Sequence, residues 1–427
     1  MKLTIHRGSK EIGGTCVELQ SGASRILIDF GLPLVDENME QFDSRKIRGK
    51  SKEELIRIGV LPNIEGLYEG EQPTINAVLL SHPHQDHYGL LPFINPKIPI
   101  YLSEGCKELI EVSHFFGQTD FNATNVKSVT VWDQFQEGDF YITPYLVDHS
   151  GFAALAFLIE AEGKRIFYSG DFRAHGRKSI LFENMLKRPP KDISYLLLEG
   201  SMMGREQGEY RGEGDIEDKL VEFFRNQEQM YFLACSSQNI DRLVSVYRAC
   251  KRSNRIFVID PYTALILHKL KNISSHIPQF DWGENIRTFF VPNTYTDKMA
   301  KDKSLFQFKS AKITYDQMQD VRHRLVIKDS YLTRQIFSKK RHLEETTLIY
   351  SMWDGYFPDV KPFWEDNNVP VLHVHCSGHA YIDDLKRFVR AIDPKFIIPI
   401  HTFFPEKYPE LFGDNVKIVK DGEMFEI

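Results

Sequence analysis

The chain has 427 residues, of which 42% are hydrophobic and 26% charged, the balance of a folded globular protein and not of a disordered one. Its 53 Lys and Arg residues and 59 Asp and Glu residues give a net charge of −6, so a nucleic-acid partner needs a local basic groove. The first residues lack the apolar core of a signal peptide, and no apolar stretch is long enough to span a bilayer. We therefore expect a cytoplasmic protein with no membrane partner.

The first 200 residues are predicted to form mainly β-strands. Alternating and β-branched residues predict strands at 3–6, 15–19, 25–29, 75–80, 98–102, 128–132, 140–147, 153–159, 165–168 and 193–198. The first three read as an antiparallel meander. The polar stretch from Glu37 to Glu71 predicts loops and one short helix. The five cysteines are scattered without a C-x-x-C pair, so we expect reduced, buried thiols.

After residue 200 strands and helices alternate, which indicates a parallel sheet. Helices are predicted at 216–224, 240–249 and from Thr263, with strands at 230–234 and 256–259. The tail then gives a strand at 369–374, a helix at 382–392 and a strand at 396–400. Because the tail resumes the histidine-rich chemistry of the first half, the order predicts an α/β domain inserted into another domain. The predicted boundaries are 1–200, 201–368 and 369–427.

The strongest functional signal is the segment Ser81-His82-Pro83-His84-Gln85-Asp86-His87. His82 and His84 lie two residues apart, so on an extended segment they point the same way and can share an ion. Asp86 and His87 follow at once and could hold a second ion. Imidazole and carboxylate groups are ligands that zinc accepts.

Further potential ligands follow later apolar strands. His149 stands in Leu-Val-Asp-His-Ser, Asp171 in Tyr-Ser-Gly-Asp-Phe and His401 in Ile-Pro-Ile-His-Thr. One such residue would mean little, but the shared context predicts a binuclear metal site.

These motifs together resemble the metallo-β-lactamase fold and, within it, the β-CASP nucleases. Glu199 in Leu-Leu-Leu-Glu-Gly-Ser resembles their acidic motif A, His379 in His-Cys-Ser-Gly-His their motif B, and His401 their motif C. The tail and the segment Cys-Ser-Ser-Gln-Asn-Ile-Asp-Arg-Leu are especially similar to ribonuclease J. The resemblance implies an αββα sandwich, in segments 1–200 and 369–427, with an inserted β-CASP α/β domain at 201–368.

The resemblance also implies the ligand sets and the chemistry. His82, His84, His149 and Asp171 would hold the first ion. Asp86, His87, Asp171 and His401 would hold the second, with Asp171 bridging. We expect two Zn²⁺ ions, with Mn²⁺ as an alternative, and cleavage of an RNA phosphodiester, either endonucleolytic or exonucleolytic. Asp86, Glu199 and His379 are the predicted catalytic residues: His379 is the candidate general acid, and Glu199 would keep it charged and oriented.

The chain departs from ribonuclease J at defined positions. Glu199 replaces the aspartate that is common there, and Tyr381 replaces the serine that follows Ser-Gly-His-x. The metal motifs are unaffected, whereas the choice of substrate does not follow from the resemblance.

Other residues are weaker candidates for substrate contacts. Arg173 and Arg177 follow Asp171 and could contact phosphates, and His375 and Ser377 belong to the motif that resembles His-x-Ser-Gly-His. Solvated surface positions for the arginines, and a structural role for His375, are the competing interpretations. A basic cluster between Arg322 and His342 has seven Lys and Arg residues against Asp329 alone, with Tyr331 and Phe337 interleaved. Such a cluster suits single-stranded nucleic acid, although a solvated face is the commoner outcome.

Three functional hypotheses follow. The favoured one is a metal-dependent RNA nuclease acting on single-stranded RNA, with homo-oligomerisation left open. The alternatives are a small-molecule hydrolase of the metallo-β-lactamase fold and a non-catalytic RNA-binding or scaffold protein. Glu199 and His379 argue against the first alternative, and the intact ligand positions argue against the second.

Overall fold

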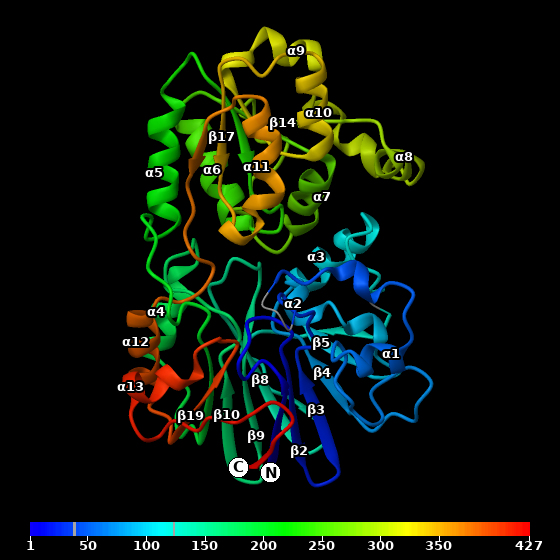
Figure 1. Cartoon of the computed structure of the whole chain (residues 1–427), viewed down its shortest axis with the longest axis vertical. Helices are drawn as coiled ribbons and strands as arrows, with labels where there is room; N and C mark the ends of the chain where they lie inside the picture. The colour runs from blue at the N-terminus through cyan, green and yellow to red at the C-terminus, as the bar shows by residue number, and fades with distance from the viewer. Residues whose placement is uncertain (37–39, 123) are drawn as a thin grey trace. The chain divides into compact units, whose positions relative to one another are not determined.

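The computed structural model describes residues 1–36, 40–122 and 124–427. It divides the chain into a first unit, Met1–Glu206 with Gly378–Ile427, and an inserted unit, Gln207–Ser377. The chain thus leaves the first unit once and returns to it near its end (Figure 1). Residues 37–39, part of the predicted polar stretch, lie outside the described residues. The rest of that stretch contains helix α1, Lys52–Arg57, which Ser51 caps by accepting a hydrogen bond from the Glu54 N–H.

The described part of the first unit contains mixed sheets built from strands far apart in the sequence. One has the order β20-β1-β2-β3-β4-β5-β6, and the other the order β19-β11-β10-β9-β8-β7. The first comprises β1 Lys2–Arg7, β2 Cys16–Ser21, β3 Ser24–Ile28, β4 Ala77–Leu79, β5 Ile100–Leu102, β6 Val126–Ser128 and β20 Met424–Glu426. The second comprises β7 Phe135–Glu137, β8 Phe140–Leu146, β9 Leu155–Ala161, β10 Lys164–Tyr168, β11 Tyr195–Glu199 and β19 Phe396–Ile400. The antiparallel pairs β1–β2 and β2–β3 confirm the predicted meander, and β20 pairs with β1, so the chain ends lie side by side (Figure 1).

The sheets pack face to face and helices cover their outer faces. Alternate apolar residues such as Leu19 of β2 and Phe157 of β9 fill the core between the sheets. The outer face of the β1–β6 sheet is covered by α1 and α3, and that of the β7–β11 sheet by α4, α12 and α13. The bounds of these helices are α3 Glu104–Phe115, α4 Ser179–Lys187, α12 Ile382–Ile392 and α13 Tyr408–Phe412. A short helix, α2 Gln85–Tyr88, follows β4. The predicted αββα sandwich is therefore confirmed.

The inserted unit is built on a parallel sheet with the order β15-β14-β13-β16-β12-β17-β18. Its strands are β12 Met230–Ala234, β13 Ile256–Ile259, β14 Ile286–Phe289, β15 Lys312–Ile313, β16 Leu325–Lys328, β17 Thr346–Tyr350 and β18 Val371–His373. Its helices are α5 Glu213–Phe224, α6 Ile240–Arg252, α7 Pro261–Leu270, α8 Thr294–Lys301, α9 Tyr315–Asp320, α10 Tyr331–Lys339 and α11 Phe357–Asp366. The buried strands are continuous apolar runs, as in Met230–Ala234, because helices cover both faces of such a sheet.

Some predicted elements differ from the structure. The strand at 369–374 was assigned to the return segment, but β18 pairs with β17 in the inserted sheet, and the units divide at 206/207 and 377/378. The predicted strand at 128–132 overlaps β6 only at Ser128, and it would have to end before Trp132, whose positive φ of 67° a strand does not accommodate. Helices α3 and α4 were not predicted.

All five cysteines are buried, as expected, and they are free thiols in the described structure. No helix among the described residues combines the length and the apolar character needed to cross a membrane.

Candidate metal centre

The predicted ligands lie in loops that follow strands of the first unit. His82 and His84 follow β4 and precede α2, which carries Asp86 and His87. His149 follows β8, Asp171 follows β10, and His401 directly follows β19. Gly31 allows the β3 loop to pass close to α2, because a Cβ there would lie 1.6 Å from the carbonyl oxygen of Asp86.

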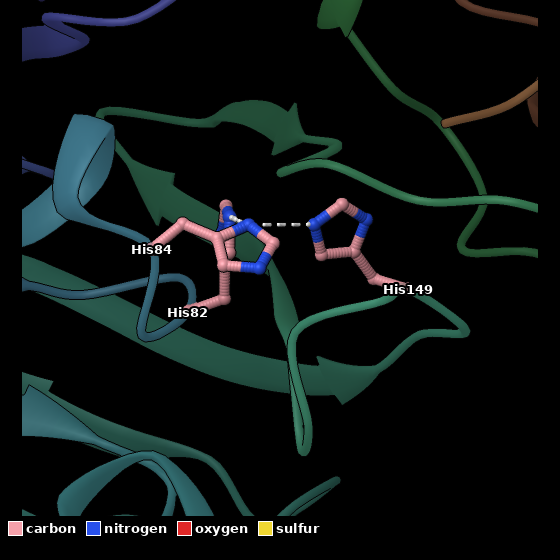
Figure 2. A group of neighbouring side chains, drawn as sticks. All are labelled: His82, His84 and His149. Atoms are coloured by element: carbon pink, nitrogen blue, oxygen red, sulfur yellow. Dashed lines mark hydrogen bonds between the residues drawn. The ribbon is translucent and has the colours of Figure 1, made fainter. Parts of the chain in front are cut away.

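A first ligand cluster consists of His82, His84, His149 and Asp171. Figure 2 shows the three imidazole rings pointing toward one another from two separate loops. His84 Nδ1 lies 3.1 Å from His82 Nε2 and 3.2 Å from His149 Nε2. Asp171 Oδ2 lies 3.6 Å from His82 Nε2. The three imidazoles thus form one group of ligand atoms that zinc accepts, with Asp171 next to His82.

A second ligand cluster consists of Asp86, His87, His401 and, again, Asp171. Asp171 Oδ2 lies 3.1 Å from His87 Nε2 and 3.5 Å from His401 Nε2. Asp86 Oδ2 lies 3.6 Å from His87 Nε2 and 3.7 Å from His401 Nε2. Asp171 Oδ2 thus lies within 3.6 Å of ring nitrogens in both clusters.

These atoms fit metal ions better than they fit one another. Zn–N distances of about 2.0–2.1 Å in a tetrahedral site place neighbouring ligand atoms roughly 3.4 Å apart, in the middle of the observed spacings. Among the described residues, His87 Nε2, His401 Nε2 and Asp171 Oδ2 are buried and make no hydrogen bond. Buried polar atoms are normally satisfied, so their convergence favours cations at this place. His401 also holds a left-handed backbone, with φ of 51°, a strain that is common at functional sites.

A residue that we did not predict, Asp29, orients the second cluster. Its carboxylate accepts hydrogen bonds from the Ser81 N–H (2.7 Å), the Ser81 hydroxyl (2.8 Å) and the Tyr168 hydroxyl (2.6 Å), and its Oδ2 lies 2.8 Å from His87 Nδ1. This contact places the ring proton of His87 on Nδ1 and leaves Nε2 to a metal. Asp29 directly follows the apolar strand β3, and His149, Asp171 and His401 likewise follow strands; that shared context was the signal available in the sequence.

Other ring nitrogens are held in the same way. His149 Nδ1 lies 2.7 Å from the carbonyl oxygen of Gly378, which fixes the proton on Nδ1 and leaves Nε2 for the first cluster. His82 Nδ1 lies 3.0 Å from the Ser81 hydroxyl, and His401 Nδ1 lies 2.8 Å from the Thr15 hydroxyl. The rings are therefore fixed in orientation before any ligand binds.

Burial and charge act differently on His87 and on the histidines of the first cluster. Burial lowers the pKa of His82 and His149 well below the ordinary value and that of His84 to about 4, so these imidazoles are neutral, the form that binds metals. Burial also lowers the pKa of His87, but the carboxylates of Asp171, Asp29 and Asp86 outweigh it and raise that pKa well above its usual range. A cation bound at His87 would therefore take the place of a proton.

The predicted catalytic pair lies beside the clusters. His379 Nδ1 lies 3.6 Å from Glu199 Oε2 and 3.8 Å from Asp171 Oδ2, and the His379 side chain is 22% exposed. Glu199 is buried at the end of β11 and accepts hydrogen bonds from the Ser201 N–H (2.9 Å) and the Ala380 N–H (3.3 Å). Burial lowers the pKa of His379, but the carboxylates of Glu199 and Asp171 outweigh it and raise the pKa. His379 also groups with Asp171 and His401, so its ring could serve as a ligand as well.

The residues predicted to contact the substrate differ in their exposure and in their neighbours. The Arg173 side chain is 0% exposed, and its Nε lies 3.6 Å from Asp148 Oδ1. Its burial argues against the expected contact with a substrate phosphate. Arg177 is partly exposed in the same loop. His375 and Ser377 belong to the inserted unit, where His375 Nδ1 lies 3.5 Å from Arg242 Nη1. Contacts of these three residues with substrate stay predictions.

Much of the basic cluster supports the fold of the inserted unit. Lys328 is buried with its Nζ 3.2 Å from Asp260, and Arg334 lies 2.9 Å from Asp329. Arg322 donates to the carbonyl oxygens of His342 and Glu344, and Arg324 to that of Asn254. Phe337 is buried in the core, whereas Tyr331 is exposed. This arrangement favours a structural role over the predicted stripe of cations and aromatic rings.

Comparisons with known proteins agree with the fold and with the presence of a metal cofactor. Residues 62–208 match the beta-lactamase superfamily domain, and residues 370–407 match the Zn-dependent metallo-hydrolase RNA specificity domain. The chain has the metallo-β-lactamase fold and is similar to ribonuclease J. The family descriptions and the ligand clusters together indicate a metal cofactor.

The similarity to curated relatives is low in identity but long. Ribonuclease J of Sinorhizobium meliloti is 21% identical over 80% of this chain and 60% of the relative. Ribonuclease J of Helicobacter pylori is 21% identical over 100% of this chain and 61% of the relative. The chain thus spans about 60% of the length of these ribonucleases J. An RNase J-like protein of Methanocaldococcus jannaschii is 20% identical over 96% of this chain and 93% of its own.

A solved structure supports the architecture. A protein of unknown function from Enterococcus faecalis V583 superposes with a TM-score of 0.78, at 21% identity, over 99% of each chain. At that identity the likeness concerns the fold alone.

Proposed function

We propose that the protein is a metal-dependent ribonuclease that hydrolyses phosphodiester bonds of single-stranded RNA. The observation that carries the proposal is the pair of ligand clusters that share Asp171 Oδ2, with His379 and Glu199 beside them. The printed names of the relatives and of the RNA specificity domain at 370–407 support RNA as the substrate.

Two zinc ions would be held by these clusters, the first by His82, His84, His149 and Asp171 and the second by Asp86, His87, His401 and Asp171. Manganese is an alternative, because mixed imidazole and carboxylate sites accept several divalent metals. When bound, such ions lower the pKa of a shared water and neutralise the negative charge that a phosphodiester develops in its transition state.

The side chains of this protein would supply orientation and the remaining proton. Hydrolysis transfers water to phosphorus and breaks the bond to the leaving oxygen, which needs a proton. His379 is the proposed donor: its Nδ1 faces Glu199, so its Nε2 is the ring atom that would deliver the proton. Glu199, fixed by two backbone N–H groups, keeps the imidazolium charged and oriented. Asp86 is the carboxylate that could accept a hydrogen bond from the attacking water.

The test is digestion of end-labelled single-stranded RNA by zinc-loaded protein, with 5′-phosphorylated and 5′-hydroxyl substrates compared. We expect cleavage that a chelator abolishes and that zinc or manganese restores. Product lengths distinguish endonucleolytic from exonucleolytic cleavage, and the comparison of 5′ ends shows whether the terminus is recognised.

The same experiment addresses the alternatives. A small-molecule hydrolase would cleave a thioester or a simple phosphodiester and leave RNA intact. A non-catalytic RNA-binding protein would shift RNA in a gel without cutting it. Either result, in protein that contains metal, would contradict the proposed function.

A further inference from the structure

A pair of stacked aromatic rings lies in the loops that carry the proposed active-site residues. The rings of His175 and Tyr381 have centroids 4.4 Å apart and planes inclined by 15°, and both side chains are partly exposed. His175 follows the shared ligand Asp171 by four residues, and Tyr381 follows His379 by two. The pair is therefore attached to the loops that carry the shared ligand and the proposed proton donor.

Both loops are anchored, so the ring pair is fixed in place. Asp148 holds the His175 loop on each side: its carbonyl oxygen accepts from the Arg173 N–H (2.6 Å) and its Oδ2 from the Gly176 N–H (2.8 Å). On the other side, the Ala380 N–H donates to Glu199 Oε1, and the Leu385 N–H donates to the Tyr381 carbonyl oxygen (3.0 Å). A preorganised aromatic surface costs little conformational entropy when it binds a ligand.

Tyrosine is an unfavourable residue at position 381, which directly precedes α12. It is the N-cap of α12, and its side chain makes no capping hydrogen bond, whereas Ser103, Asp260 and Ser330 cap α3, α7 and α10 through theirs. Serine is preferred at an N-cap, so helix stability does not explain a tyrosine. A residue that breaks a local rule beside a functional centre indicates a functional requirement.

The acidic first turn of α12, next to Tyr381, favours a base over a phosphate. The first turn of α12 carries Asp383, 95% exposed, and Asp384, so the helix start does not attract an anion. A flat aromatic surface instead suits a nucleobase, which has a π face whatever its identity. Only an unpaired base can be splayed out onto such a surface, which excludes a duplex.

We propose that the His175–Tyr381 ring pair stacks on the nucleobase of a nucleotide close to the scissile phosphate and thereby selects single-stranded RNA. This inference rests on the proposed ribonuclease function and names how its substrate is positioned. Tyr381 and His175 would act in substrate binding, with no part in metal binding or proton transfer.

The test uses a set of short single-stranded RNAs in which one abasic ribonucleotide is moved through the positions on both sides of the cleaved bond. For the wild-type protein, we expect one position at which loss of the base lowers kcat/KM by about 5- to 150-fold, the range for one base stacked on an aromatic side chain. In Tyr381→Ser that penalty should fall to within about twofold, since serine restores the cap and removes the ring. Tyr381→Phe should keep the penalty, because it keeps the ring.

Tyr141→Ser is the matched control, since Tyr141 is 46% exposed on β8 of the same unit and makes no ring contact with His175. The measured quantity is a ratio of two substrates within each variant, so a change in the fraction of folded enzyme does not alter it. Equal cleavage of normal and abasic RNA by the wild type, or an unchanged penalty in Tyr381→Ser, would overturn the inference and leave the ribonuclease proposal standing. Absence of RNA cleavage with every substrate would refute the ribonuclease proposal and the inference with it.

Discussion

Replacement of Asp29 by asparagine tests whether the hydrogen bonds behind the ligands prepare the metal centre. The Asp29 side chain is 0% exposed, and its Oδ2 faces His87 Nδ1, the Ser81 hydroxyl and the Tyr168 hydroxyl. In Asp29→Asn the NH₂ group takes the position of Oδ2, because Oδ1 accepts from the Ser81 backbone N–H and must remain an oxygen. The hydroxyls can rotate to accept from it, but His87 can accept only if its proton moves from Nδ1 to Nε2, the ligand atom. In this variant, His87 therefore cannot both accept a hydrogen bond at Nδ1 and bind a metal through Nε2.

The size of the effect follows from that contact. A hydrogen bond to a charged group contributes about 1.5–3 kcal/mol, and loss of a partner behind a metal ligand typically weakens binding by about 10- to 100-fold. We expect the zinc affinity of the second cluster to fall by about that factor, measured by competition with a chromophoric chelator. The first cluster would bind zinc through the imidazole rings of His82, His84 and His149, so it should retain most of its zinc affinity.

Glu213→Gln in the inserted unit is the matched control. Glu213 is likewise buried and accepts hydrogen bonds from Arg242 (3.1 Å) and Ser245 (2.7 Å), far in sequence from the ligands. Its variant should lower the free energy of unfolding but leave the zinc affinity unchanged. Wild-type zinc affinity in Asp29→Asn, or an equal loss in Glu213→Gln, would refute the reasoning.

Other substitutions separate the remaining roles. His379→Ala should lower the single-turnover cleavage rate by roughly 10²–10⁴ with metal content unchanged, as expected for a proton donor; loss of metal would instead make His379 a ligand. His401→Ala should lose the ion of the second cluster together with activity, as elemental analysis would show, and full metal content would contradict the ligand assignment. Burial raises the pKa of Asp329 to about 6 despite Arg334 and Lys328, so the native state holds a proton that the unfolded state releases between about pH 4 and pH 6. The free energy of unfolding should therefore fall across that range in wild type and fall less in Asp329→Asn; equal urea-unfolding profiles of the two proteins would contradict this.

The sequence predicted elements well where one physical signal dominated. The apolar run Met230–Ala234 and the amphipathic helix Ile382–Ile392 have the predicted bounds, because burial of a strand on both faces and of one helix stripe leave clear patterns. The run at 128–132 was misleading, since Val129 and Val131 pack against the core although both lie outside the strand β6. The strand at 369–374 was placed in the wrong sheet, because its composition does not specify which neighbour it pairs with.

The residues of the site could be predicted from the sequence to a similar extent. Ligands in a compact motif, such as His82 and His84, and those directly after strands could be named, since chain geometry brings strand ends together. Asp29 was overlooked because a single aspartate after a strand looks like an ordinary turn residue until its partners are known. Arg173 was misjudged for a related reason: a basic residue near a metal ligand reads as a phosphate contact, whereas its burial against Asp148 depends on the fold.

In the proposed centre, two metal ions would share Asp171, and both would be required for RNA cleavage. The most direct measurement is a titration of metal-free protein with zinc, in which bound zinc and the single-turnover cleavage of a labelled single-stranded RNA are followed in the same samples. We predict that cleavage rises with bound zinc and saturates at about two ions per chain, and that Asp171→Ala neither reaches this stoichiometry nor cleaves. Full activity with one ion per chain, or wild-type cleavage by Asp171→Ala, would contradict the shared-carboxylate centre.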